Sequence, residues 1–300
     1  MKYPWLLAVL LPLYIHTTQT VAFDDEFIFE SNNAGVQSML EEWVAEAEQG
    51  VVEAQYQLAR LQMSGHIVVR DFTAAAYWMQ QAAKGGHIEA QYYLGVLYEE
   101  GIGADQNFSR SFEWYRKSAE AGYVLAQYQL GIIYSDGFIA PRNLEASAYW
   151  YLQAAAQGMA EAQNNLGLLY LEGKGVPQNY QVASAWFEKA ADQRVADALT
   201  SLGALYVQGL GVEQDYYKAM ELFFEAAAQD HVEAEYNLGI MYAYGIGVLK
   251  QDKKAYQWLR RAAAQGHVKA EREIRLIRER KANDRKDRVP AIIAEYSQIG

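Results

Sequence analysis

The stretch from Ala90 to Leu125 reads AQYYLGVLYEEGIGADQNFSRSFEWYRKSAEAGYVL, and it recurs along the chain with a fixed period of 36 residues. The same alanine returns at each step, at Ala54, Ala90, Ala126, Ala162, Ala198, Ala234 and Ala270. A period of this length without insertions is typical of a solenoid, in which each unit stacks on its neighbours. The sequence therefore predicts one extended array rather than two globular domains.

Each unit carries the pattern of two helices. In the first half, Ala90, Leu94 and Tyr98 fall on one face of an amphipathic helix. The residue after the leucine is glycine in five of six units, although glycine inside a helix costs ~1 kcal/mol relative to alanine. We therefore expect a neighbouring backbone to approach closely there. The second half places tryptophans in register, each followed by small residues against which a large core ring could pack: Trp78, Trp114, Trp150, Trp186 and Trp258.

Turn and cap residues separate the predicted helices. Glycine-marked turns end in an Asp or Asn that can cap the second helix, at Asp71, Asn107, Asn143, Asn179 and Asp215. Glycines that can end the second helix with a left-handed backbone follow at Gly86, Gly122, Gly158 and Gly266. Arg194 and Asp230 replace this glycine in the fourth and fifth units, so we expect those two junctions to turn differently.

These motifs together resemble the Sel-1-like repeat, a relative of the tetratricopeptide repeat. The shared pattern is A-x-x-x-L-G-x-x-Y, then G-x-G-V, a capping Asp or Asn, W-[YF]-x-x-A-A and G-H. Departures are local: Gln62 replaces the tyrosine, and Ile139 to Pro141 replace one G-V step. The resemblance implies an all-α fold, a right-handed α-solenoid of helix-turn-helix repeats forming a tetratricopeptide-like superhelix. Six repeats are predicted over residues 54–269, namely 54–89, 90–125, 126–161, 162–197, 198–233 and 234–269.

Residues 1–22 are predicted to be a secretory signal peptide. Lys2 supplies the positive start, an apolar core runs from Trp5 to Ile15, and cleavage is expected after Ala22. The apolar core is shorter than the ~20 residues that span a bilayer, although an uncleaved anchor is the alternative. The predicted location is therefore the periplasm or the exterior of a bacterium.

The segments that flank the repeats are predicted to cap the array. Residues 23–37 form an acidic and aromatic leader, and residues 38–53 an N-terminal capping helix. Residues 270–288 form a basic C-terminal capping helix, followed by an apolar tail over 289–300. The basic helix is either a solvated capping face or a contact for an anionic surface or acidic partner.

Composition and motifs argue against catalysis. The chain has no cysteine, which excludes disulfides and thiolate zinc sites, and its net charge of −11 disfavours nucleic acid as a partner. No nucleophile elbow, zinc-protease motif or phosphate loop is present. His87, His231 and His267 share one repeat position, which indicates a structural role rather than a metal site. We predict no catalytic residue, no cofactor and no metal.

The face of the first helices opposite the predicted core is aromatic and apolar. In solenoids of this kind the first helices line the concave side, so this face would form the floor of a groove that binds a protein or peptide. Alternatively, its tyrosines pack between neighbouring first helices. Nearby Glu99, Glu100, Asp136 and Glu172 favour a basic ligand. The predicted partner-binding residues are Tyr56, Tyr92, Val96, Glu99, Tyr128, Ile132, Leu168, Tyr236 and Ile240.

The resulting prediction is a non-catalytic adaptor or scaffold of the bacterial cell envelope, with protein or peptide partners. A structural subunit of an envelope secretion or motor assembly is the first alternative. An enzyme that acts on cell-wall or β-lactam-like substrates is the second, but the cysteine-rich relatives proposed for such activity depend on paired cysteines that this chain lacks.

Overall fold

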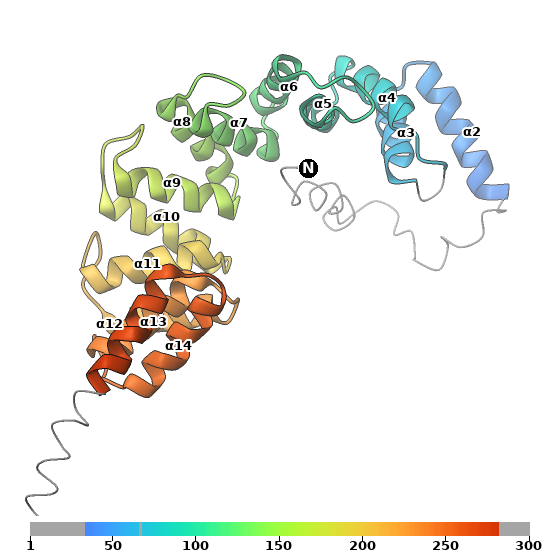
Figure 1. Ribbon diagram of the computed structural model, residues 1–300. Coiled ribbons are helices and arrows are strands. Elements are labelled where there is room, and N and C mark those ends of the chain that lie inside the picture. The colour runs from blue at the N-terminus through green and yellow to red at the C-terminus, as the bar shows by residue number, and fades with distance from the viewer. Residues whose placement is uncertain (1–33, 66–67, 282–300) are drawn as a thin grey trace, which may run out of the picture. The chain divides into compact units, whose positions relative to one another are not determined.

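The computed structural model describes residues 34–65 and 68–281, and every regular element within these ranges is a helix (Figure 1). The chain divides into two compact units, Met1–Ser111 and Phe112–Gly300, which are described separately below. The predicted signal peptide, most of the leader and the tail lie outside the described residues.

The first unit contains the incomplete repeat at the N-terminal end and the repeats that follow it. Its helices are α2 (Ala34–Glu48), α3 (Val52–Ser64), α4 (Phe72–Lys84), α5 (Ile88–Glu100) and the start of α6 (Phe108–Glu120). Successive helices from α2 to α5 pack on one another. Ala47 of α2 joins Ala54 and Leu58 of α3 in a buried cluster that Trp78 covers. Thus α2 packs as the second helix of a preceding repeat would.

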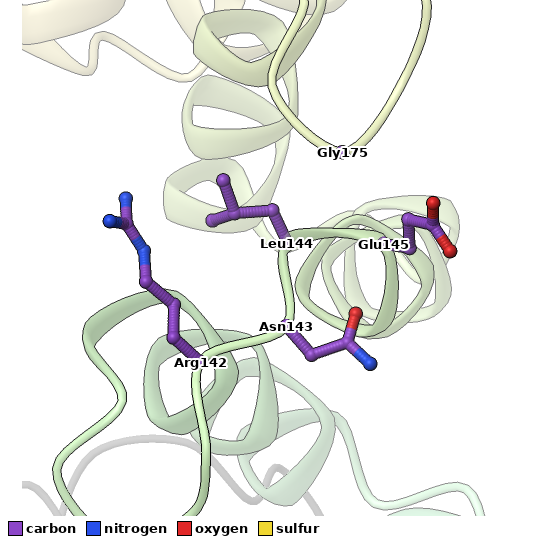
Figure 2. A pocket seen from close by; sticks show the side chains of 5 residues that line it. All are labelled: Arg142, Asn143, Leu144, Glu145 and Gly175. Atoms are coloured by element: carbon purple, nitrogen blue, oxygen red, sulfur yellow. The ribbon is translucent and has the colours of Figure 1, made fainter.

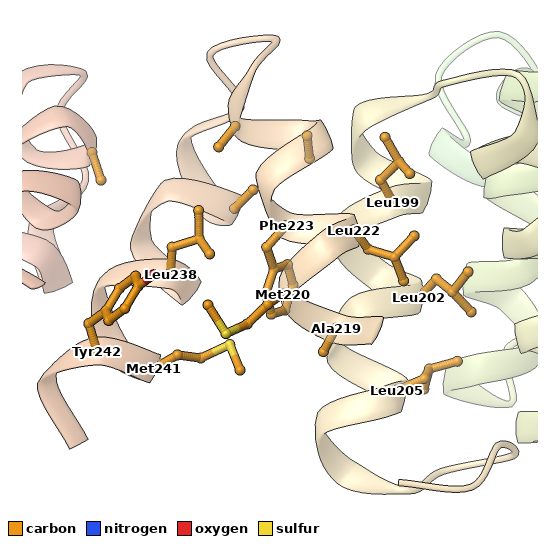
Figure 3. Packing of buried hydrophobic residues seen from close by; sticks show 14 of the residues in the cluster. Leu199, Leu202, Leu205, Ala219, Met220, Leu222, Phe223, Leu238, Met241 and Tyr242 are labelled. Carbon is orange, nitrogen blue, oxygen red and sulfur yellow. The ribbon is translucent and has the colours of Figure 1, made fainter. Parts of the chain in front are cut away.

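The second unit continues the same helix-turn-helix order. Its helices after α6 are α7 (Val124–Asp136), α8 (Leu144–Ala156), α9 (Ala160–Glu172), α10 (Tyr180–Asp192), α11 (Ala196–Gln208), α12 (Tyr216–Ala227), α13 (Val232–Tyr244), α14 (Asp252–Ala264) and a further helix over 268–281. One buried cluster runs from Ala183 to Ile277, and Figure 3 shows its central part, with Leu202, Phe223 and Leu238 contributed by successive helices. The predicted helical solenoid is confirmed.

In α7, α9, α11 and α13, the glycine in the middle of the first helix faces an aromatic or aliphatic side chain of the second helix. A Cβ on Gly167 would lie 2.7 Å from Cε1 of Phe187, and a Cβ on Gly203 equally close to Cε1 of Phe223. Because real Cβ atoms do not approach other atoms so closely, these positions accept only glycine without adjustment. The prediction of close packing is confirmed, but the partner is a side chain and not the backbone that we expected.

The tryptophans are not the central core rings of the second unit. Trp150, Trp186 and Trp258 are half-buried, whereas the residue that follows each of them is buried. Trp186 packs against the cluster formed by α8 and α9, and Lys189 Nζ lies 4.1 Å from the centroid of its ring. The expectation that the tryptophan fills the core is therefore wrong. The residue after it does so, as Phe187 does after Trp186.

The helix ends follow the predicted chemistry, with one correction. Asn179 Oδ1 accepts a hydrogen bond from the Val182 amide at 3.0 Å, and Asp215 caps α12 in the same way through the Lys218 amide. Gly158 has a φ of 93°, and Arg194 and Asp230 take the left-handed conformation at the equivalent position, with φ of 63° and 58°. The two junctions therefore turn as the glycine junctions do, in a conformation that costs non-glycine residues energy.

The second glycine of each G-x-G turn allows one repeat to lie directly on the previous one. A Cβ on Gly175 would meet the backbone carbonyl of Leu144, at the start of α8. A Cβ on Gly211 would likewise meet the backbone carbonyl of Tyr180, at the start of α10. These glycines therefore fix the stacking of repeats, which supports their assignment as structural turns rather than phosphate-binding loops.

Glutamines link successive repeats in the second unit. The Gln163 side-chain amide donates to the Ala155 carbonyl at 3.2 Å, and Gln193 Nε2 donates both to Gln163 Oε1 and to the Gly158 carbonyl at 3.0 Å. These bonds satisfy carbonyl groups at the end of a second helix, which have no partner within their own helix. Polar side chains thus hold neighbouring repeats in register.

Candidate partner-binding surface

Tyr56 of the first unit belongs to the packing between repeats. Its hydroxyl donates to Glu89 Oε2 at 2.6 Å, and its ring stacks on His87 at a centroid distance of 4.0 Å. Burial and the bond to Glu89 raise the pKa of Tyr56, so its hydroxyl stays protonated. The alternative reading, in which tyrosines pack between neighbouring first helices, describes this residue.

Two of the three predicted binding residues of α5 are also withdrawn from the surface. Tyr92 and Val96 are buried, and Glu99 is half-buried. Tyr92 meets Tyr93 edge to face at 5.2 Å, and burial raises its pKa. Side chains with so little exposed area cannot supply the floor of a groove, so the stripe predicted for the first unit is mainly core.

The predicted residues of the second unit keep part of their surface. All five are half-buried: Tyr128, Ile132, Leu168, Tyr236 and Ile240. Each of them packs one side of its side chain against a buried cluster, and the other side faces away from the core. We refer to these five residues on α7, α9 and α13 as the second-unit stripe.

Aromatic contacts hold the two tyrosines of the second-unit stripe in place. Tyr128 lies 5.8 Å from Tyr151, and Tyr236 stacks on His267 at 4.3 Å. Burial raises the pKa of both tyrosines, and the negative charge of Glu161 adds to the effect at Tyr128. Each tyrosine is therefore a neutral, oriented group that combines an apolar ring with a polar tip.

Acidic residues border the stripe, but some of those predicted are already engaged. Glu172 pairs with Lys174 at 2.7 Å, and Asp136 Oδ1 accepts from the Phe138 amide at 2.9 Å. An acidic position that the sequence analysis missed is the second residue of successive first helices, occupied by Glu161, Asp197 and Glu233, all exposed. The spacing of 36 residues was the signal that could have found them.

The repeated histidines prove to be helix caps. His231 Nδ1 accepts from the Ala234 amide at 3.3 Å, and its Nε2 lies 2.9 Å from Asp197 Oδ1. His87 and His267 make the same pair of contacts, with Glu53 and Glu233 as the carboxylate partners. The bond to His231 lowers the pKa of Asp197. The predicted structural role of this repeat position is confirmed, and its mechanism is capping combined with a link to the preceding repeat.

Figure 2 shows an open depression lined by Arg142, Asn143, Leu144, Glu145 and Gly175. Asn143 caps α8 and Gly175 lies on the Leu144 backbone, so both have structural roles. Among residues 34–65 and 68–281, no group of three or more potential ligands could hold a metal ion. None of the helices in the described ranges has both the length and the hydropathy that a membrane span requires.

Two solved structures similar to this chain are repeat proteins. A Sel1 repeat protein from Oxalobacter formigenes is 27% identical, with a TM-score of 0.62, over 77% of this chain and 97% of that chain. A protective antigen of uropathogenic Escherichia coli with an SLR fold is 28% identical, with a TM-score of 0.59. That alignment covers 78% of this chain but only 58% of the antigen. No curated protein matches the chain significantly.

The model of the Sel1 repeat matches the chain six times in succession, at residues 52–87, 88–123, 124–159, 160–195, 196–231 and 232–267. Each match begins two residues before the boundary predicted above and coincides with the start of a first helix. The matches cover most of the chain and agree with the helix pairs, the interlocking glycines and the structural neighbours. The protein therefore belongs to the Sel1 repeat family.

Proposed function

We propose that the chain is an exported adaptor of the bacterial cell envelope and that the second-unit stripe takes up a segment of a partner protein. Proteins with Sel1 repeats are generally scaffolds for protein interactions and typically non-catalytic, which makes protein binding the appropriate class of function. The observation that carries the proposal is the half-exposed state of the five stripe residues, which differs from the burial of the equivalent residues of the first unit.

The physical argument is preorganisation. Tyr128 is held by Tyr151, and Tyr236 by His267, so their rings lose little rotamer freedom when a ligand covers them. Rigid aromatic side chains contribute strongly to protein interfaces because they offer large contact areas at low entropic cost. Ile132, Leu168 and Ile240 add apolar area beside them. An extended or helical segment with apolar anchors would fit such a stripe.

Export is part of the proposal because of the N-terminal sequence. A positive start, an apolar core of signal-peptide length and a small-residue site over residues 1–22 support it. The lack of cysteine is compatible with an oxidising compartment. N-terminal sequencing of the protein purified from a native host would test this part, since cleavage after Ala22 leaves Phe23 as the first residue.

The binding part is tested by affinity capture from envelope extracts, followed by titration of the purified partner. The parent chain is compared with the Ile132→Ser, Ile240→Ser double variant and with Tyr149→Ser as a control. Tyr149 is 54% exposed on α8 and lies outside the stripe. We expect the double variant to lose affinity by about tenfold or more, which is ~1.4 kcal/mol, while the control binds like the parent. Equal affinity of all three proteins would refute the role of the stripe.

A further inference from the structure

The two terminal helices of the described chain belong to opposite halves of the repeat. At the N-terminal end, α2 aligns with the second helices: Gly50 after it has a φ of 89°, as Gly86 has 93° after α4. At the other end, the helix over 268–281 aligns with the first helices and buries Ala270, Ile274 and Ile277. Within the described residues, the array therefore begins with a second helix and ends with a first helix.

Within the described residues, no first helix packs on the face of α2 that would meet its own first helix. In α10 this face consists of Ala183, Phe187 and Ala190, which are all fully buried against α9. Met39, Trp43 and Glu46 occupy the same three repeat positions in α2, and all three are only half-buried. The described part of the chain contains no first helix before α2. This face of α2 thus combines two large apolar side chains with a carboxylate.

The matching face at the other end carries guanidinium groups. Arg275 occupies the repeat position of Gly167, which receives the ring of Phe187 within a complete repeat. Arg278 stands one turn further on, and its Nη2 donates to the Tyr256 hydroxyl at 3.0 Å. Both arginines are exposed. The last helix of the described residues therefore presents positive charge on the face where, within a repeat, a second helix packs.

The charges of the two terminal helices are complementary. In α2 there are four glutamates, Glu41, Glu42, Glu46 and Glu48, and no basic residue. The helix over 268–281 has six basic residues and three acidic ones, although the whole chain has a net charge of −11. Long-range attraction between unlike ends favours association in one orientation and disfavours contacts between like ends.

We propose that α2 of one copy docks on the helix over 268–281 of a second copy, so that the two form a helix pair across the contact. The arginine at the glycine position prevents the ring-on-glycine packing found inside repeats, because any Cβ there lies too close to the ring. The contact instead places guanidinium groups against the Trp43 ring and the carboxylates of Glu42 and Glu46. It is heterologous, so further copies can add at both ends.

Sedimentation equilibrium of the purified chain over a range of concentrations tests the proposal. At ~50 mM salt we expect the average mass to rise with concentration, and at ~500 mM salt to approach that of the monomer, because exposed charges are screened. Arg275→Glu and Glu42→Arg should each weaken self-association by about tenfold or more. Lys218→Glu and Glu213→Arg make the same charge changes at exposed positions outside the terminal helices and should have no effect.

A mixture of the two end variants gives the sharpest result. The Glu42→Arg protein keeps its C-terminal helix, and the Arg275→Glu protein keeps its α2, so an equimolar mixture should associate at a concentration at which each variant alone is monomeric. A mixture that stays monomeric overturns the proposal, as does a parent chain that is monomeric under all conditions. Binding of the parent to anionic lipid vesicles that depends on Arg275, without any self-association, would assign the basic helix to a membrane surface instead and also overturn it.

Discussion

The ring of Phe187 lies directly against Gly167: a Cβ placed on this glycine would be 2.7 Å from Cε1 of the ring. Phe223 and Gly203 repeat this relationship one unit later. A glycine that is unfavourable for the isolated helix is therefore favourable for the pair, because it lets a large ring fill the space between two helices. This contact explains why the sequence accepts glycine in the middle of its first helices.

Substitution of this glycine tests the interlock. Gly167→Ala gains ~1 kcal/mol of helix propensity but overpacks the contact at a cost of ~1–3 kcal/mol. We expect a net loss in the free energy of unfolding, measured by urea denaturation, and recovery when Phe187→Met is added, because the first repeat buries Ala59 and Met79 at the same two positions. A Gly167→Ala protein as stable as the parent would show that the ring can move aside freely.

Truncation of adjacent aromatic residues should give unequal losses. Phe187→Ala removes a fully buried ring and should cost ~3–5 kcal/mol. Trp186→Ala removes a half-buried ring, so its cost in the same unfolding assay should be clearly smaller. An equal or larger loss of stability for Trp186→Ala would show that the tryptophan fills the core, as the sequence analysis expected.

The left-handed arginine offers a stabilising substitution. Arg194→Gly relieves a backbone conformation that costs a non-glycine residue ~1 kcal/mol. The substitution also removes the exposed pair of Arg194 with Glu225 at 3.2 Å, and such pairs contribute little. We expect a higher melting temperature for Arg194→Gly and a lower one for Gly158→Ala, measured by calorimetry. A lower melting temperature for Arg194→Gly would mean that the ion pair outweighs the strain.

The histidine cap predicts a pKa change. The bond from His231 lowers the pKa of Asp197, so this carboxylate stabilises the fold above its pKa in the unfolded chain, and the contribution is lost as pH falls through the lowered value. His231→Ala should return the pKa of Asp197 toward its ordinary value in an NMR titration. His267→Ala removes an equivalent cap elsewhere and should leave Asp197 unchanged; an unaltered pKa in both variants would contradict the assignment.

The period of the sequence was enough to predict the helices, the turns and the caps, because these depend on local chemistry repeated every 36 residues. It could not separate Trp186 from Phe187, since both are large aromatic residues at adjacent positions. Nor could it separate Tyr92 from Tyr128, which share a repeat position but differ in burial. Such differences depend on the side chains that the neighbouring helices supply. These side chains vary between repeats that share the same pattern, so the pattern alone does not distinguish the two positions.

The most direct test of the proposed binding surface is site-specific photo-crosslinking, because it does not require weakening the fold. A photoreactive residue is placed at Ile132 or Ile240 in the second-unit stripe, and at Tyr149, a more exposed residue on α8, as a control. The chain is then irradiated in intact cells. We predict that one partner protein is crosslinked from both stripe positions and not from Tyr149. Crosslinking of that partner from Tyr149 but from neither stripe position would contradict the account.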